Sequence, residues 1–142
     1  MEVDILSKYN QTNQFGNYLD LKIKILKPGD VKYTVLVKKH HLATPKSAHG
    51  GFVSAIFDQI VGTAALSKLI LESKLVSSVE FKINFLKPVF LGDDLVGHGL
   101  VIQGGKRLYK VKGDIFNQNN NLVATEIATL NAYPFEKSDM SS

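Results

Sequence analysis

The feature that most constrains this chain is a long run, from Gly50 to about Ile70, that is apolar on almost every side of a helical wheel. A helix of this kind is buried in protein, because it has no polar face to give to water. Asp58, Gln59 and Lys68 interrupt the run, so no uncharged window reaches the roughly 18 residues that suggest a membrane span. The pattern therefore predicts one buried helix and no membrane segment.

The remainder of the chain has the two-residue period of β-strands. Apolar and polar side chains alternate over residues 17–27 and 31–38, and Pro28-Gly29-Asp30 between them predicts a hairpin turn. Four more strand-like runs follow the helix, at 76–89, 94–103, 107–117 and 122–133, and turn-forming residues separate them. With a short helix at the N-terminus, this order predicts an α+β fold in which one antiparallel sheet covers one helix.

The composition limits the functions that this chain can have. Its 142 residues suffice for one domain with its own core, which we expect over residues 1–136, followed by a polar tail at 137–142. The chain has no cysteine, which excludes disulfides, zinc–thiolate sites and a cysteine nucleophile, and its start is not a secretory signal. We therefore expect a cytoplasmic protein. The net charge is +4, but Arg107 is the only arginine, which argues against nucleic-acid binding.

The residues that open the helix, His49-Gly50-Gly51, have the composition of an oxyanion-binding site. Glycines let a ligand approach the free N–H groups of a first helical turn, which carry the positive end of the helix dipole. Such N–H groups stabilise an oxyanion. Asp58 lies farther along the helix among apolar neighbours, where an ionised carboxylate is costly and is rarely kept without a purpose. Each feature also has a structural explanation, as a turn, a helix cap or a salt bridge to a lysine.

Gly50 and Asp58 are too far apart to act on the same atom from one chain. At about 1.5 Å rise per residue they are separated by about 12 Å along the helix. An antiparallel two-fold pairing of two helices brings Gly50 of one subunit towards Asp58 of the other, and a second subunit also covers the part of the helix that the sheet leaves open. His40, His41 and His98 have no ligand-like spacing, so we predict no metal site.

These motifs resemble those of the hotdog-fold acyl-CoA thioesterases, in particular the phenylacetate-degradation and 4-hydroxybenzoyl-CoA thioesterase type. The resemblance covers most of the chain and rests on His49-Gly50-Gly51, Asp58, and the segments 62–65, 78–88, 92–93 and 104–107. It implies a long central helix wrapped by a curved antiparallel sheet of about six strands. It also implies a homodimer, which can pair further into a dimer of dimers, with active sites between subunits.

The resemblance implies a role for each residue of the motifs. Asp58 would be the catalytic carboxylate, as nucleophile or general base, and the Gly50 N–H would polarise the thioester carbonyl. His49 would position the thioester or support the helix start, and Ser78 would hold the water or the carboxylate. Residues implied in substrate binding are Gly51, Ser77 (a substitute for Ser78), Asn84, and Lys106 and Arg107 near the CoA phosphates. No cofactor is implied, and the substrate is an acyl-CoA.

One departure from the family leaves alternatives open. Many relatives carry an asparagine six residues before the histidine, and this chain has Ala43 there. A noncatalytic protein that binds acyl-CoA or fatty acid is therefore the alternative to a thioesterase, and a hotdog hydratase or dehydratase is a further one. The identity of the acyl group, and the choice between CoA and a carrier protein, are also left open by the sequence.

Overall fold

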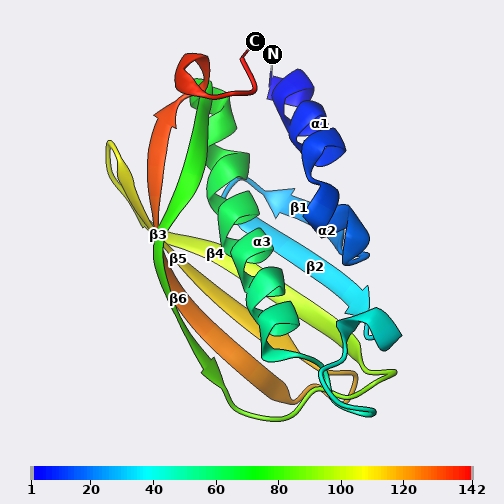
Figure 1. Cartoon of the computed structure of the whole chain (residues 1–142). Coiled ribbons are helices and arrows are strands. Elements are labelled where there is room, and N and C mark those ends of the chain that lie inside the picture. The colour runs from blue at the N-terminus through cyan, green and yellow to red at the C-terminus, as the bar shows by residue number, and fades with distance from the viewer. Residues whose placement is uncertain (1, 142) are drawn as a thin grey trace.

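A six-stranded antiparallel sheet curves around one long helix, α3, in the computed structural model, which describes residues 2–141 (Figure 1). The strand order across the sheet is β1-β2-β4-β5-β6-β3. The strands are β1 (Lys22–Lys27), β2 (Asp30–Leu36), β3 (Lys74–Phe85), β4 (Asp94–Gly104), β5 (Leu108–Phe116) and β6 (Leu122–Pro134). The helices are α1 (Glu2–Thr12), α2 (Gln14–Tyr18) and α3 (Gly50–Leu69), with single 3-10 turns at Lys39–His41, Ile70–Glu72 and Phe135–Lys137. The predicted α+β hotdog fold is confirmed.

The helix α3 packs directly on the backbone of the sheet. At Gly99 on β4, an added Cβ would lie 2.5 Å from Ile60 Cγ2 and 2.9 Å from the Ile60 carbonyl oxygen, so only glycine fits. Ile56, Phe57 and Ile60 of α3 are almost completely buried in the main core, together with residues of β2, β4, β5 and β6. This close contact fixes the rotation of α3, and with it the residues of α3 that face away from the sheet.

Two strand boundaries differ from the prediction by more than two residues. The expected strand 17–27 begins only at Lys22, because residues 14–18 form α2, in which the Asn13 side chain caps the N–H of Gly16 at 3.1 Å. Local capping by asparagine competes with an extended backbone, and Asp20 then turns the chain with a φ of 62°. The expected strand 76–89 ends at Phe85, shortly before Pro88, which has no N–H to give to a sheet.

The N-terminal segment covers part of α3 that was expected to need a second subunit. Tyr9 packs against Leu66 and Ile70 in a small second core, and Asn13 Nδ2 donates a hydrogen bond to Gln59 Oε1 at 2.8 Å. Of the described residues, only Gly50–Glu72 is long and apolar enough to cross a membrane, and 67% of its most apolar window is buried inside the fold. A core helix gives the same result.

The two edges of the sheet have different chemistry. The edge strand β1 is short and carries several lysines, which is a common protection against strand pairing. The other edge strand, β3, is twice as long, and the apolar side chains of Val79, Phe81 and Phe85 are 58%, 42% and 56% exposed on it. A long apolar edge strand is a template for pairing with another strand.

Candidate active site

A histidine cap and two glycines build the start of α3. His49 is the N-cap, and its Nδ1 accepts a hydrogen bond from the Gly51 N–H at 2.7 Å. A Cβ on Gly51 would lie 2.8 Å from that nitrogen, so glycine at this position makes room for the cap. His49 therefore supports the helix start, which is one of the two roles expected for it.

Gly50 differs from Gly51 because its N–H is open. Nothing among residues 2–141 accepts a hydrogen bond from this group, which belongs to the first turn of α3 and lies at the positive end of the helix dipole. A Cβ on Gly50 would come no nearer than 3.9 Å to its closest neighbour, the ring of Phe85. The Gly50 N–H is therefore accessible to an anionic or carbonyl oxygen.

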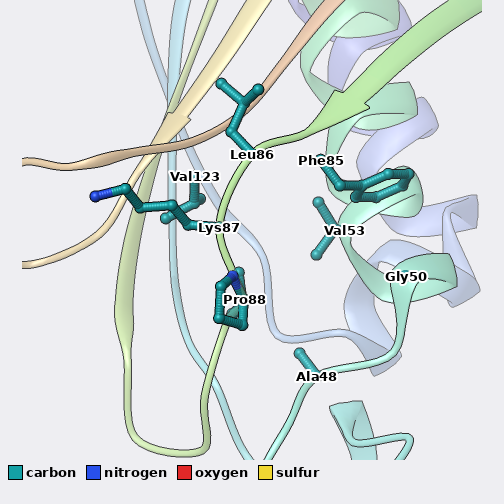
Figure 2. A pocket seen from close by; sticks show the side chains of 9 residues that line it. Ala48, Gly50, Val53, Phe85, Leu86, Lys87, Pro88 and Val123 are labelled. Atoms are coloured by element: carbon teal, nitrogen blue, oxygen red, sulfur yellow. The ribbon is translucent and has the colours of Figure 1, made fainter.

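A pocket lies beside Gly50. Its volume is about 300 Å³, and Figure 2 shows Phe85 and Val53 beside the approach to Gly50. The lining residues are Ala48, Gly50, Val53, Phe85, Leu86, Lys87, Pro88, Val89 and Val123. Most of these side chains are apolar and Lys87 is the one charged residue among them, a combination typical of small-molecule sites. The pocket suits an apolar chain whose polar group reaches the Gly50 N–H.

Asp58 lies on the other part of the candidate site. Ser78 Oγ donates a hydrogen bond to Asp58 Oδ1 at 2.8 Å, joining α3 to the first half of β3. The expectation of an interior Asp58 is wrong for the single chain, because Ser54, Asp58 and Gly62 lie one turn apart on the sector of α3 that faces away from the sheet, and Asp58 is exposed. Ser77 precedes Ser78 on the strand and faces the opposite side of the sheet.

The structure does not bring Gly50 and Asp58 together within one chain. Gly50 lies near Phe85, at the end of β3, whereas Asp58 contacts Ser78, in the first half of the same strand. The two halves of the expected site are therefore displaced from each other along β3, in agreement with the separation calculated from the helix.

The remaining expected binding residues are dispersed. Asn84 pairs with Thr125 on β6 and lies on the face of the sheet opposite α3, since its strand neighbour Ile83 packs into the main core. Lys106 and Arg107 are exposed in the turn between β4 and β5, and the Arg107 carbonyl accepts a hydrogen bond from the N–H of residue 132. This turn lies at the Ser78 end of the sheet, away from Gly50.

One carboxyl near the candidate site was missed by the sequence analysis. Glu126 on β6 is 1% exposed, and neither of its side-chain oxygens has a hydrogen-bond partner in the part of the chain that the structure describes. Burial, with a smaller contribution from the charge of Asp58, raises the pKa of Glu126 from 4.5 to about 8. The sequence contained one indication of this buried position: Glu126 alternates along β6 with Ala124 and Ala128, which face the helix.

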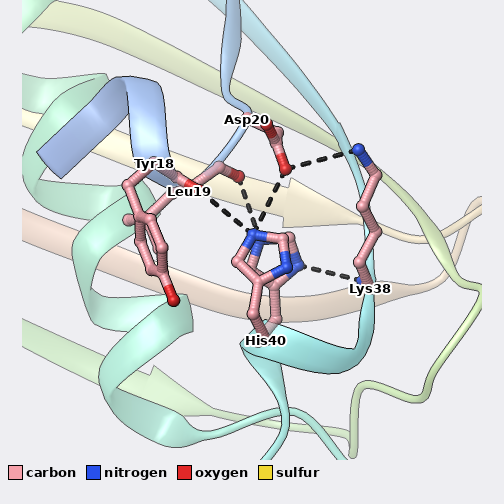
Figure 3. Close-up of polar contacts among 6 residues, drawn as sticks. Tyr18, Leu19, Asp20, Lys38 and His40 are labelled. Carbon is pink, nitrogen blue, oxygen red and sulfur yellow. Dashed lines mark hydrogen bonds and ion pairs between the residues drawn. The ribbon is translucent and has the colours of Figure 1, made fainter. Parts of the chain in front are cut away.

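A group of acidic and histidine side chains lies apart from this site, near α2 (Figure 3). The ligand atoms of Asp20, His40 and His41 lie within 4.8 Å of one another. Both ring nitrogens of the buried His41 are engaged, since Nδ1 accepts from the Lys38 N–H at 2.9 Å and Nε2 donates to the Leu19 carbonyl at 3.0 Å. Burial lowers the pKa of His41, and the nearby His40 lowers it further. The cluster ties α2 to the turn after β2, and a metal would have to break these hydrogen bonds.

Comparison with solved structures confirms the fold. The PaaI protein of Escherichia coli, from the phenylacetic acid degradation operon, is 22% identical and matches with a TM-score of 0.84 over 93% of each chain. A Streptococcus mutans protein solved with acetyl-CoA bound is 26% identical, with a TM-score of 0.74 over 80% of this chain and 89% of that one. Both have the fold described above.

Comparison of sequences gives the family. An esterase-named protein of Archaeoglobus fulgidus is 28% identical over 112 residues, which are 79% of this chain and 70% of its own. The profile of the thioesterase superfamily matches residues 46–124, more than half of the chain, so the chain belongs to the thioesterase superfamily. It is a thioester hydrolase, and the resemblance to the hotdog-fold thioesterases is confirmed.

Proposed function

We propose that the protein hydrolyses an acyl-CoA to a carboxylic acid and free CoA, without a cofactor. The observation that carries this proposal is the open N–H of Gly50, a residue that lines an apolar pocket of about 300 Å³. A thioester has a polar carbonyl flanked by an apolar acyl chain and a long thiol arm, which suits these two features. The Streptococcus mutans relative was solved with acetyl-CoA and a Streptococcus pneumoniae relative with coenzyme A, which supports the choice of CoA.

The chemistry follows from the two parts of the site. The Gly50 N–H donates a hydrogen bond to the thioester carbonyl and stabilises the negative charge that develops on its oxygen. Asp58, held by Ser78, accepts a proton from a water whose oxygen bonds to the carbonyl carbon, or itself attacks that carbon to form an anhydride. The C–S bond then breaks, and the thiolate leaves and takes up a proton. On the anhydride route, a water then attacks the anhydride, which releases the carboxylic acid and restores the Asp58 carboxylate.

The site requires a second copy of the chain, because Gly50 and Asp58 lie apart in one chain. We assign the contact to the exposed edge of β3, which pairs with its own copy in an antiparallel ladder. The expected partner is thus the homodimer, and a dimer of dimers is compatible with it. A cytoplasmic location is proposed with it, since a chain without cysteine gains nothing from an oxidising compartment.

The charges on β3 favour one register for this ladder. Phe81 faces α3 together with Ile83, whereas Glu80 and Lys82 lie on the opposite face, and directly paired residues share a face. When Phe81 pairs with the partner's Phe81, Glu80 pairs with the partner's Lys82 twice by symmetry. The next register that keeps paired residues on the same face of the sheet is shifted by two residues. It pairs Lys82 with the partner's Lys82, which is repulsive. In the first register, Ser78 also lies within one residue pair of the partner's Phe85 along the ladder. Because Phe85 is the side chain next to Gly50, Ser78 then lies near the partner's Gly50.

A charge exchange on β3 tests this register. Glu80→Lys is expected to raise the dimer dissociation constant about tenfold, since two attractive pairs become repulsive. The double variant with Glu80→Lys and Lys82→Glu is expected to restore it, because the pairs are rebuilt with reversed signs. Sedimentation velocity over a concentration series measures both, with Glu136→Lys as a control of the same charge change outside β3. Additive weakening in the double variant would contradict the register.

The Gly50 N–H is tested by filling the space in front of it. Gly50→Val is expected to lower kcat/KM about a hundredfold, because its methyl groups obstruct the approach of the carbonyl oxygen. Gly50→Ala is expected to have a smaller effect, since its Cβ has 3.9 Å of clearance. Rates from thiol release, with thermal unfolding of both variants to verify the fold, measure this. Equal, near-normal rates in both variants would exclude Gly50 from the oxyanion contact.

The function itself is tested by thiol release from short, medium, long and aromatic acyl-CoAs, followed with a thiol-reactive dye. We expect turnover of at least one member, and the ranking of kcat/KM values then defines the acyl group. Silence across the panel with an intact dimer would contradict the acyl-CoA proposal and direct the search to carrier-protein thioesters.

A further inference from the structure

His41 is a buried side chain that the proposed reaction leaves without a role. It belongs to the 3-10 turn Lys39–His41 and is 1% exposed. Its Nδ1 accepts a hydrogen bond from the Lys38 N–H at 2.9 Å, and its Nε2 donates one to the Leu19 carbonyl at 3.0 Å. Because a buried polar group without a partner costs free energy, these two bonds hold the ring in one orientation.

The backbone of His41 holds the residue that caps α3. The His41 carbonyl accepts a hydrogen bond from the His49 N–H at 2.8 Å, and a bridge between Leu42 and Ala48 closes the loop between them. The His41 ring also stacks on the ring of Phe52, with centroids 3.9 Å apart and an interplanar angle of 11°. Phe52 is buried in the first turn of α3. His41 therefore contacts the start of α3 through both its backbone and its side chain.

The peptide that joins His49 to Gly50 carries the open N–H of the candidate site. Its carbonyl accepts hydrogen bonds from the N–H groups of Phe52 at 3.0 Å and Val53 at 3.3 Å. A trans peptide is planar, so its N–H points opposite to its carbonyl, which here is out of the helix start. The helix thus sets the direction of the Gly50 N–H, whereas the bond from the His49 N–H to the His41 carbonyl sets where this peptide lies.

We propose that His41 is a positioning residue of the acyl-CoA hydrolysis proposed above: by fixing the loop end at His49, it holds the Gly50 N–H where the thioester oxygen is bound. The inference rests on that function. An oxyanion donor acts only within hydrogen-bond distance of the developing charge, and a displacement of about 1 Å can lower the rate about a hundredfold. His41 needs no contact with the substrate, because it acts through the loop.

His41→Phe tests this role with the ring stack retained. A phenyl ring can still stack on Phe52, but it neither accepts from the Lys38 N–H nor donates to the Leu19 carbonyl. We expect kcat to fall about tenfold with KM nearly unchanged, since the Gly50 N–H contributes most in the transition state. His41→Asn, whose oxygen can accept from the Lys38 N–H, gives a second variant if phenylalanine is poorly tolerated, and its kcat is also expected to fall.

His40→Phe is the matched control. The His40 Nε2 lies 3.0 Å from the Tyr18 carbonyl and 3.2 Å from Asp20 Oδ2, so this side chain also ties α2 to the turn. Within residues 2–141, however, no hydrogen bond, ion pair or ring contact joins His40 to α3. Its kcat is expected to equal that of the wild type. An equal loss of kcat in both variants would mean that anchoring α2, and not holding the helix start, is what matters.

A double-mutant cycle gives a readout that a merely structural role would not move. If His41 acts through the Gly50 N–H, His41→Phe should cost less than about threefold in kcat once Gly50→Val has obstructed that group. A structural role elsewhere predicts the full tenfold loss in both backgrounds. Multiplicative losses in the double variant therefore overturn the proposal.

Hydrogen exchange of backbone amides tests the positioning without turnover. In His41→Phe, the amides of His49 and Gly51 are expected to exchange about tenfold faster relative to amides of the central strand β5, because the hold on the helix start is loosened. In His40→Phe the ratio should stay as in the wild type. Acceleration no greater than that of β5 contradicts the role of His41, whereas a wild type that is silent towards every acyl-CoA contradicts the proposed function instead.

Discussion

Asp58→Asn is expected to lower kcat for acyl-CoA hydrolysis about a thousandfold, because an amide neither accepts a proton from water nor attacks a carbonyl carbon. The substitution changes little else. The asparagine Oδ1 can still accept the hydrogen bond that Ser78 donates at 2.8 Å, and the side chain is exposed on the single chain, so folding should be retained. Steady-state thiol release with the best substrate of the panel measures the change.

Asp114→Asn is the matched control for Asp58→Asn. It replaces the same carboxylate by the same amide, but on β5, on the outer face of the sheet, where Asp114 accepts a hydrogen bond from Thr125 and pairs with Lys112. Its kcat is expected to equal that of the wild type. A thousandfold loss confined to Asp58→Asn, with an unchanged dimer by sedimentation, supports a chemical role. Near-normal turnover in Asp58→Asn would remove Asp58 from the mechanism.

The positions of the helix and strands were predictable wherever the hydrophobic period was long and regular. The predicted helix from Gly50 to about Ile70 agrees with α3 to within one residue, and each predicted strand has a counterpart in the sheet. The error at residues 17–21 came from local capping, because the period of two continued through a segment that Asn13 and Asp20 fold differently. Alternation of apolar residues alone does not report such side-chain to backbone hydrogen bonds.

The sequence did not predict the exposure of Asp58. The resemblance to the thioesterases implied that Ser78 holds the water or the carboxylate, and the structure has Ser78 in contact with the Asp58 carboxylate. The outward orientation of Asp58 was not predictable from the helical wheel, because a helix that is apolar on all sides does not indicate which sector faces the sheet. That rotation depends on the close approach of Ile60 to Gly99, which is a contact between distant parts of the chain.

Glu126 was missed for a similar reason. Its strand was predicted, but the burial of one polar side chain depends on the strand register, which places Gly113 beside it on β5 and Ile83 on β3. Register between strands that are far apart in sequence is not contained in the pattern of a single strand. Buried carboxyls of this kind become visible only when the sheet is assembled.

The stability of the folded protein is expected to fall as the pH rises towards 8, and Glu126→Gln is expected to remove most of this loss. The pKa of Glu126 is raised from 4.5 to about 8 in the folded chain, so between these values the folded state binds a proton that the unfolded state has lost. Stability decreases with pH wherever the folded state binds more protons. The stability that this bound proton contributes is thus fully present below pH 4.5 and is lost as the pH rises through about 8.

The size of this effect follows from the shift. A difference of 3.5 between the two pKa values of Glu126 corresponds to at most about 5 kcal/mol, and partial relaxation around the carboxylate reduces the expected value to about 3–4 kcal/mol. Glu126→Gln should therefore be more stable than the wild type by about this amount at pH 9 and nearly equal to it at pH 4.5. Urea unfolding at both pH values and one fixed protein concentration measures the difference, since a dimer's stability depends on concentration. Asp114→Asn serves again as the control. If the stability difference between Glu126→Gln and the wild type is the same at both pH values, Glu126 does not titrate with a raised pKa.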